Sequence, residues 1–465
     1  MRMISALPVT AAVAIGALTT ACLVGPNYVK PTLPAPDTFR GASVASSSAS
    51  LADAKWWDVF ADQQLQALLR TAVTDNYDVR IAAIRVMQAE AQLGVTRSNA
   101  YPTVDLDLQA GAQRTPAAGT TEARTAAGVL VQGRAAWELD FWGRYRRETE
   151  ASRARLLETQ WGQRAVLTSL VSRVADGYFQ LRALDLERDI AQRTLTSRNE
   201  SLDLTRIRER GGATSLVDVR QAEQLVYAAA ATIVDLDRRI TQQENFISTL
   251  IGSFPVSIAR GLDLTAQPHA PEVPAGLPSS LIARRPDIQA AEQEIVATNA
   301  EIGAARAAYF PAISLTGSGG LQSTALSALF SGGAGLWSVA AGAAQPIFTA
   351  GRTRSQVALA EARRQEATLN YEATVKEAFR EVSDALIGYS KAREFREQQE
   401  LLFTAAQDAR RLADIRYRGG ATSYLEVLDA DTRLFNAEIG QADARLSELS
   451  GFVELYRALG GGWQP

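Results

Sequence analysis

The stretch IRYRGGATSYLEV, residues 415–427, places two adjacent glycines between segments whose composition favours helix. Glycine in a helix interior is destabilising, so the pair predicts a reversal of the chain between two helices. Nearly the same stretch occurs 208 residues earlier as IRERGGATSLVDV, residues 207–219, with nine of thirteen positions identical. The chain therefore uses this turn twice, which indicates an internal duplication.

Two further pairs of segments share this offset. Residues 77–106 parallel residues 286–315, and LDFWGR (139–144) parallels IFTAGR (347–352). Every landmark thus recurs at a spacing of 208 or 209 residues, which is typical of a duplicated domain half and not of a solenoid repeat. The sequence predicts a first copy at residues 77–266, a Pro-rich linker at 267–285, a second copy at 286–459 and a C-terminal tail at 460–465.

Each copy is predicted to carry the same elements in the same order. A helix of about 24 residues ends just before Pro102 or Pro311, because proline cannot continue a helix. Two strands and a Gly/Ala/Ser/Thr-rich loop follow. A helix over residues 143–210 or 351–418 then leads to the Gly-Gly turn, after which helix resumes. At a rise of 1.5 Å per residue each such helix is roughly 100 Å long, which indicates a coiled-coil-like assembly.

The residue inventory argues against several classes of function. One cysteine and one histidine leave no internal disulfide, no Cys/His metal cluster and few nucleophile–base pairs. A formal net charge of −3 gives no reason to expect nucleic acid as a partner. The sequence also offers no phosphate-binding loop. We therefore expect no enzyme, no cofactor, no metal site and no nucleic-acid binding.

The N-terminus has the composition of an export signal. An apolar run from Ile4 to about Leu18 follows Arg2 and is too short for a comfortable membrane span. LTTAC, ending at Cys22, resembles a bacterial lipobox, in which the cysteine receives a diacylglycerol and becomes the mature N-terminus. The match is imperfect, since Thr19 stands where leucine is usual, and a plain signal peptide with an incidental cysteine is the alternative. We expect residues 1–21 to be removed and Cys22 to be lipidated.

The expected strands alternate apolar and polar residues. VLVQGRAAWELD (129–140) and TVDLDLQAGAQ (103–113) show this most clearly, and residues 313–318 and 337–343 repeat it with smaller side chains. Runs of this length suit tilted transmembrane strands, although a soluble sheet with one solvated face alternates in the same way. Four strands cannot close a barrel in a membrane, so the chain must pool strands with copies of itself. A conduit needs at least three copies, and hence twelve strands.

Six landmarks run in order across residues 22–465: CLVGPNYVKP, KWWDVFADQQLQALL, ARRPDIQAAEQEI, AARAAYFPAISLTG, QPIFTAGR and YRGGATSYLEVLDA. Together they resemble the TolC-like outer-membrane efflux factors, in particular the lipoprotein branch that includes OprM and NodT-type proteins. The resemblance implies a mixed α and β membrane protein: a homotrimer with a twelve-stranded outer-membrane β-barrel, four strands per chain, continued by a long periplasmic α-helical barrel. It implies an equatorial mixed region to which the lipid-anchored segment 22–76, the linker and the C-terminus contribute.

Members of this family are passive exit ducts. They serve an inner-membrane pump, commonly of the proton-driven RND type, through a periplasmic adaptor (membrane fusion) protein. The resemblance therefore implies export of drugs or other small toxic compounds by a protein in the outer membrane, in contact with its lipid and extending into the periplasm. Two alternatives stay open: a duct for type I protein secretion, and a lipid-anchored helical scaffold that forms no pore.

The Gly-Gly turns would form the periplasmic tip. Glu426 and Asp429, at i and i+3, share one helix face, and three copies would give a ring of six carboxylates that favours cations. The alternative is that both are solvated charges, with Asp429 paired to Arg433. The resemblance implies that Glu426 and Asp429 form a constriction, and that Tyr417 bonds Asp218 of the other hairpin and holds the gate closed.

The resemblance also implies that the turns meet the adaptor; their glycines are Gly211, Gly212, Gly419 and Gly420. Thr422 departs from the family pattern, since some members place there an arginine that adds a second latch. Thr214 or Ser215, and Thr422 or Ser423, are suited to cap the helices that return from the turns.

Overall fold

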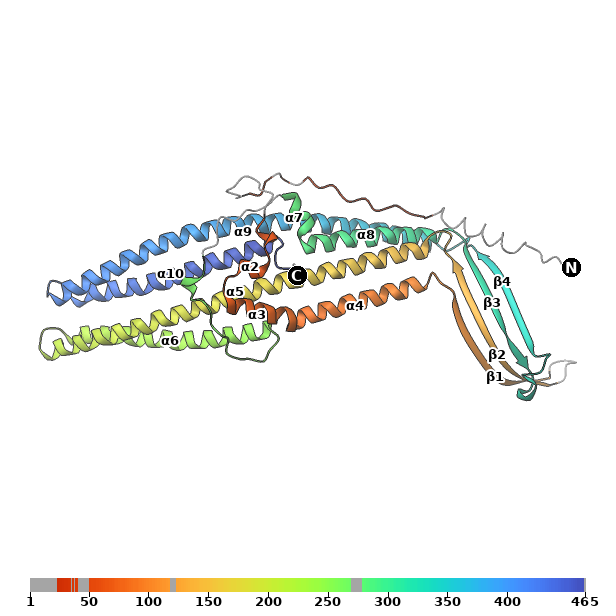
Figure 1. Ribbon diagram of the computed structural model, residues 1–465, viewed down its shortest axis with the longest axis horizontal. Coiled ribbons are helices and arrows are strands. Elements are labelled where there is room, and N and C mark those ends of the chain that lie inside the picture. Colours follow the sequence, from red (N-terminus) through yellow and green to blue (C-terminus); the bar gives the residue numbers. More distant parts are fainter. Residues whose placement is uncertain are drawn as a thin grey trace. The chain divides into compact units, whose positions relative to one another are not determined.

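A computed structural model describes residues 23–34, 36, 38–40, 50–117, 123–268 and 278–463 (Figure 1). The predicted signal peptide, Cys22, residues 269–277 of the Pro-rich linker and the last two residues lie outside the described residues. The chain divides into two compact units. The sheet unit comprises Met1–Thr32, Arg85–Gln160 and Ala290–Glu372, and the helical unit comprises Leu33–Ile84, Trp161–Gln289 and Ala373–Pro465.

Matching elements of the two halves have matching lengths: the first, long and returning helices count 22, 67 and 35 residues in each. The first half contains α4 (Tyr77–Ser98), β1 (Thr103–Thr115), β2 (Arg124–Leu139), α5 (Arg144–Arg210) and α6 (Leu216–Leu250). The second contains α8 (Pro286–Ala307), β3 (Ala312–Ser323), β4 (Gly335–Ala344), α9 (Arg352–Arg418) and α10 (Tyr424–Ala458). Outside this pattern lie α2 (Trp56–Val59), α3 (Gln63–Asp75), α7 (Pro278–Arg284), and the 3-10 helices η2 (Leu51–Asp53), η3 (Leu264–Ala266) and η4 (Leu326–Ala328).

Equivalent side chains make equivalent hydrogen bonds in the two halves. Trp137 donates to the carbonyl of Ala100 at 3.0 Å, and Gln345, 208 residues after Trp137, donates to the carbonyl of Tyr309 at 3.0 Å. Likewise Asn76 donates to the last turn of α6 at 2.8 Å, and its counterpart in the second half, Arg285, donates to the last turn of α10 at 3.1 Å. The backbone plan has thus survived substitution of the donor side chains.

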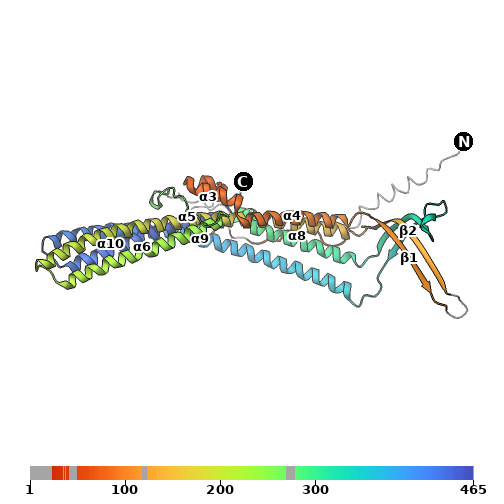
Figure 2. The ribbon, with the colours of Figure 1, turned by 90° about the horizontal axis from the view of Figure 1, so that it is seen from below.

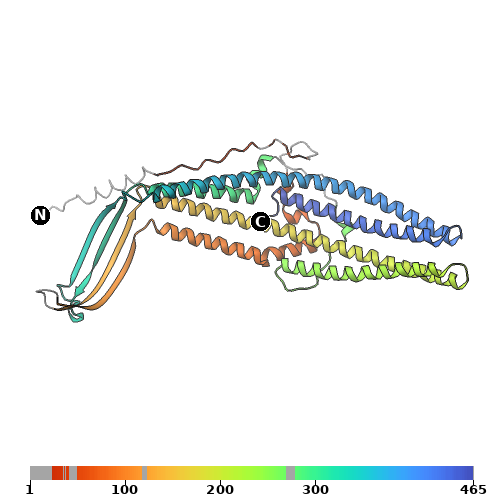
Figure 3. The same cartoon turned by 180° about the vertical axis from the view of Figure 1, so that it is seen from behind.

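The four strands form one antiparallel sheet in the order β1-β2-β3-β4 (Figure 3). Val104 lies opposite Ala135, which lies opposite Gly317, which lies opposite Val339, so the predicted apolar face continues across all four strands. The opposite face carries Asp107 and other polar residues, as the alternation predicts. Strands β1 and β4 are the free edges of the sheet within one chain.

The first strand-connecting loop is shorter than the sequence suggests. The Gly/Ala/Thr-rich composition of residues 115–128 favours a loop over that whole range, yet β2 begins at Arg124, which pairs with Thr115. The sequence TEARTAAG lacks alternation, so it carries no strand signal of its own. Hydrogen bonding to β1 extends the strand there, because the hairpin register continues beyond the alternating segment.

The chain contains two antiparallel hairpins, α5 with α6 and α9 with α10, whose helices lie mostly in the helical unit (Figure 2). Their long helices lack interior proline, which permits 67 uninterrupted helical residues. Near the turns the hairpins share one apolar cluster, the tip cluster: Leu202, Val219, Ala222, Val226, Ala413, Tyr417, Tyr424, Val427 and Ala430. Among the helices that the structure describes, none combines the length and the apolar character that a membrane span requires.

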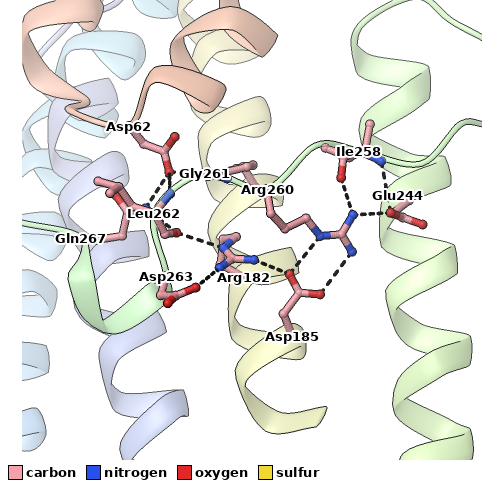
Figure 4. A network of polar contacts seen from close by, with 11 residues as sticks. Asp62, Arg182, Asp185, Glu244, Ile258, Arg260, Gly261, Leu262, Asp263 and Gln267 are labelled. Atoms are coloured by element: carbon pink, nitrogen blue, oxygen red, sulfur yellow. Dashed lines mark hydrogen bonds and ion pairs between the residues drawn. The ribbon is translucent and has the colours of Figure 1, made fainter. Parts of the chain in front are cut away.

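A buried carboxylate, Asp62, joins three parts of the helical unit (Figure 4). It caps α3 by accepting the amides of Gln64 and Leu65 at 2.8 and 3.3 Å. Its other oxygen accepts from Tyr178 of α5 at 2.9 Å. The same oxygen accepts the amide of Leu262 at 2.8 Å and the side-chain amide of Gln267 at 2.9 Å, which fixes the segment after α6.

Arginines continue this network along α5. Arg182 binds Asp185 at 2.7 Å and Asp263 at 2.5 Å, and Arg260 binds Asp185 at 3.0 Å (Figure 4). At Gly261 a Cβ atom would lie 2.1 Å from the carboxylate of Asp62, so only glycine allows this approach. The network therefore holds the segment that follows α6 against α3 and α5.

Candidate functional site

Each tip turn, residues 211–215 or 419–423, ends a long helix and begins the next. In the first turn the amides of Gly212 and Ala213 donate back to carbonyls of the last turn of α5 at 2.9 and 2.8 Å. These two bonds define a Schellman motif, which places one residue in the left-handed region. Gly212 takes that position with φ 74°, and Gly420 takes it in the second turn with φ 74°.

The predicted tip glycines therefore differ in what they contribute. Gly212 and Gly420 supply a conformation that side chains disfavour. A Cβ at Gly211 would meet no atom nearer than 3.6 Å, and one at Gly419 none nearer than 3.4 Å, so these two positions tolerate a small side chain.

Asp218 belongs to the cap of α6. Ser215 is the N-cap residue, its hydroxyl accepts the amide of Asp218 at 3.4 Å, and Asp218 accepts the amide of Ser215 at 3.0 Å, which forms a capping box. Thr214 also donates to this carboxylate, and its bond, followed by those from Ser215, lowers the pKa of Asp218. In the second turn Thr422 donates in the same way to Glu426, the counterpart of Asp218.

Tyr417 lies in the tip cluster and is 6% exposed. The guanidinium of Arg208, from α5 of the other hairpin, lies 4.3 Å from the centre of the Tyr417 ring. The ring of Tyr424, from α10 of the same hairpin, has its centre 5.5 Å from that of Tyr417. The Tyr417 hydroxyl is buried without a hydrogen-bond partner within the described part of the chain. Tyr417 thus connects the two hairpins by packing.

The predicted hydrogen bond between Tyr417 and Asp218 is absent from this chain. The reason is local competition: Thr214 and Ser215, four and three residues before Asp218, already occupy its carboxylate. The prediction of this bond within one chain was therefore wrong, whereas the role of the two residues in a gate stays a prediction.

Glu426 and Asp429 both pair with arginines of the same chain. Glu426 binds Arg416 at 3.2 Å, and Asp429 binds Arg433 at 2.8 Å with side chains 60% and 74% exposed. Neither carboxylate is buried, so both remain able to face an aqueous lumen. Among the described residues no group of three or more acidic, histidine or cysteine side chains is placed to hold a metal ion.

A charge cluster beside the tip was missed by the sequence reading. Asp431 binds Arg198 of α5 at 2.8 Å and Arg410 of α9 at 3.3 Å. Arg198 is nearly buried, with 6% of its side chain exposed, and also donates to the carbonyl of Leu225 in α6 at 3.1 Å. This cluster, here called the Asp431 cluster, therefore links all four tip helices.

A signal for the Asp431 cluster exists in the sequence. Tyr424, Val427 and Asp431 follow one another at spacings of three and four residues, so the carboxylate stands on the apolar stripe of α10. A charge on a buried stripe requires a partner, but the sequence does not show which arginine supplies it.

Comparison with known proteins identifies the family. The family profile described as outer membrane efflux protein matches residues 68–253 and 277–461. The toluene efflux pump outer membrane protein TtgC of Pseudomonas putida is 36% identical over 452 residues, 95% of this chain and 93% of the relative. The cation efflux system protein CusC of Escherichia coli is 33% identical over 450 residues, 96% of each chain.

A solved structure agrees with these matches. The open state of the Neisseria gonorrhoeae MtrE outer membrane channel superposes with a TM-score of 0.87 and 32% identity, covering 95% of this chain and 100% of that one. The predicted fold class, with four strands per chain, and the prediction of an outer-membrane efflux channel are thereby confirmed. The chain belongs to the outer membrane efflux protein family and is an outer-membrane channel that extends into the periplasm.

Proposed function

We propose that three copies of this chain form the exit duct of a tripartite efflux system. A periplasmic adaptor joins the duct to an inner-membrane pump of the RND type, and the cargo is small toxic compounds. The observation that carries this proposal is the extent of the match: both halves match the family, and relatives named for toluene and cation efflux are covered almost completely. Four strands per chain fit a barrel of twelve strands from three chains.

Deletion of the gene and restoration by the wild-type chain test this function. We expect deletion to lower the minimal inhibitory concentrations of organic solvents, antibiotics or metal cations, and the restored strain to regain resistance. Unchanged resistance to all three classes, with loss of a secreted protein from the medium, would favour the type I secretion alternative. Cross-linking in cells followed by mass spectrometry identifies the adaptor.

A gate at the tip forms part of the proposal. Tyr417 packs across the two hairpins, so Tyr417→Ala removes a buried ring and frees the tip to open. We expect a severalfold rise in single-channel conductance in planar bilayers. Tyr227→Ala is the matched control, because Tyr227 lies on α6 and is 66% exposed. Equal conductance of both variants and the wild type would contradict a gating role for Tyr417.

Asp218 is expected to act through its helix cap. Asp218→Asn keeps the shape of the side chain and weakens the charge-assisted bonds from Thr214 and Ser215. It should therefore change conductance less than Tyr417→Ala does. A larger effect of Asp218→Asn would indicate that this carboxylate contacts a neighbouring copy.

Lipidation of Cys22 is the last part of the proposal, and the fixed position of the following segment supports it. The amide of Val24 donates to the carbonyl of Trp142 at 3.2 Å, and the buried Arg147 donates to Asn27 at 2.8 Å. The segment after Cys22 is thus bound at the junction of β2 and α5. We expect the N-terminal peptide to carry the mass of three acyl chains, and Cys22→Ser to lose it; an unmodified Cys22 thiol would refute lipidation.

A further inference from the structure

The internal duplication indicates how the free edges of the sheet, β1 and β4, can pair with a neighbouring copy of the chain. Thr103 of β1 lies opposite Ala136 of β2, and Ala312 of β3 lies opposite Ala344 of β4. Thr103 plus 209 is Ala312, and Ala136 plus 208 is Ala344. The two hairpins therefore have the same register, so the sequence offsets hold inside the sheet.

Between the hairpins lies an internal seam, formed by β2 and β3. This seam pairs Gly133 with Gly319, and Ala135 with Gly317. The equivalent of β2 in the second half is β4, and the equivalent of β3 in the first half is β1. β4 and β1 are the free edges of the sheet. The β1 strand of a second copy can therefore pair with β4 of the first copy in the same way as β3 pairs with β2 inside one chain.

Resting on the proposed trimer, we propose the register of that contact: β4 of one copy pairs with β1 of the next so that Ala341 lies opposite Ala110. The arithmetic follows from the internal seam, because Gly133 plus 208 is Ala341 and Gly319 minus 209 is Ala110. The internal seam is thus the template for the seam between copies.

The chemistry of the two edges agrees with this register. Val339 on β4 and Leu108 on β1 are 79% and 68% exposed in the single chain and belong to the apolar face. The register places apolar positions of β4 opposite apolar positions of β1, so the belt continues across the seam. If β1 of the next copy were shifted by one residue relative to β4, its polar side chains would lie beside the apolar side chains of β4, since side chains alternate with period two.

The helices beside the sheet support the same operation. At the internal seam Arg155 of α5 pairs with Glu301 of α8, and burial together with the nearby Glu294 raises the pKa of Glu158. The equivalents of Glu158 and Glu294 across the copies are Glu366 and Arg85, both exposed in the single chain. The internal seam thus sets two carboxylates near each other, whereas the seam between copies sets a carboxylate near a guanidinium.

The end of the seam carries matching apolar material. In the internal seam Trp142 stacks on Phe310 with ring centres 4.7 Å apart. Tyr101 is the counterpart of Phe310 and is 69% exposed, and the loop after β4 presents Phe348 at 87% exposure. The counterpart of Trp142 in that loop is Ala350, so a neighbouring copy seated in the proposed register brings the loop after β4 to Tyr101.

Disulfide formation between copies tests the register. Opposite Cα atoms in an antiparallel pair are about 4.5–5.5 Å apart, within the reach of a disulfide. We therefore expect Ala341→Cys/Ala110→Cys, oxidised in outer membranes with copper phenanthroline, to give covalent trimers on non-reducing gels. A bond within one chain is excluded, because β1 and β4 are separated by two strands.

Ala341→Cys/Ala112→Cys and Ala341→Cys/Leu108→Cys are matched controls. Each shifts one partner by two residues, about 6.6 Å along the strand, which puts the sulfurs beyond bonding reach. Single-cysteine variants show any reaction of Cys22. Gly342→Cys/Gln109→Cys tests the same register with side chains on the other face of the sheet. Because opposite residues alternate between hydrogen-bonded and non-hydrogen-bonded pairs, the two in-register variants sample both kinds of pair.

The outcomes separate the register from the assembly. Cross-linking of both in-register pairs and of neither control supports the proposal. Cross-linking of a shifted control, or of no pair although unheated samples run as trimers, overturns the register and leaves the trimer. Unheated wild-type protein that runs as a monomer refutes the proposed trimer itself.

Discussion

Asp431→Ala should destabilise the tip by about 3–5 kcal/mol, because it leaves a nearly buried arginine without its carboxylate. Arg198 has 6% of its side chain exposed and cannot turn to water without opening the hairpins. Arg410 is affected less, since Asp414 lies 3.6 Å away as a second partner. We expect amide hydrogen exchange in the first three turns of α10 to be faster by a factor of roughly a hundred or more.

Asp429→Ala is the matched control for this variant. Asp429 lies two residues earlier on the same helix, but its pair with Arg433 is exposed and contributes less than about 1 kcal/mol. Arg198→Met/Asp431→Leu should recover most of the stability, because apolar residues of similar volume often replace a buried ion pair without loss. Equal exchange rates in Asp431→Ala and Asp429→Ala would show that the Asp431 cluster contributes nothing special.

Asp62→Ala should have the second large effect, a loss of more than about 3 kcal/mol, because several donors then lose a charged acceptor at once. The buried donors include the hydroxyl of Tyr178 and the side-chain amide of Gln267. We expect a marked fall in the thermal midpoint of the purified protein in detergent. Asp53→Ala is the control, since Asp53 is a half-exposed carboxylate that also caps a short helix.

The same carboxylate predicts a pH dependence. Burial alone would raise the pKa of Asp62, but hydrogen bonds from Gln267, Tyr178 and two backbone amides outweigh burial and lower it. Because the pKa of Asp62 is lower in the folded state than in the unfolded state, its ionised carboxylate stabilises the fold at pH values above the unfolded-state pKa of about 3.9. This stabilisation is lost as the pH falls through the folded-state pKa. The wild type should lose thermal stability below about pH 4 more steeply than Asp62→Asn. Parallel curves for the two proteins would contradict this assignment.

Local features were predictable from the sequence, and contacts between distant segments were not. The tip turns followed from Gly-Gly between helical segments, because a Schellman turn depends on a few adjacent residues. The sheet faces followed from alternation, except where residues 124–128 join β2 by pairing alone. The long helices followed from the absence of proline over residues 144–210 and 352–418.

The candidate site shows the same division. Thr214 and Ser215 stand beside Asp218, so the capping bond could have been read from the sequence as the competitor of a bond to Tyr417. The Asp62 network has no such signal, because its members come from three separate segments and follow no period. Only the folded chain shows which of 48 basic residues meets Asp431.

Glu209 stands 208 residues before Tyr417 and is its counterpart in the first half of the chain, and this difference between the halves has a consequence for symmetry. A ring of six identical half-length chains would repeat every substitution six times around the axis. Fusion of two halves in one gene reduces this to three, so the position of Tyr417 can be aromatic while Glu209 holds a charge in the other half. In the proposed trimer three copies of Tyr417 and three copies of Glu209 alternate around the axis. Six identical subunits could not form this arrangement, because each would carry the same residue at the equivalent position.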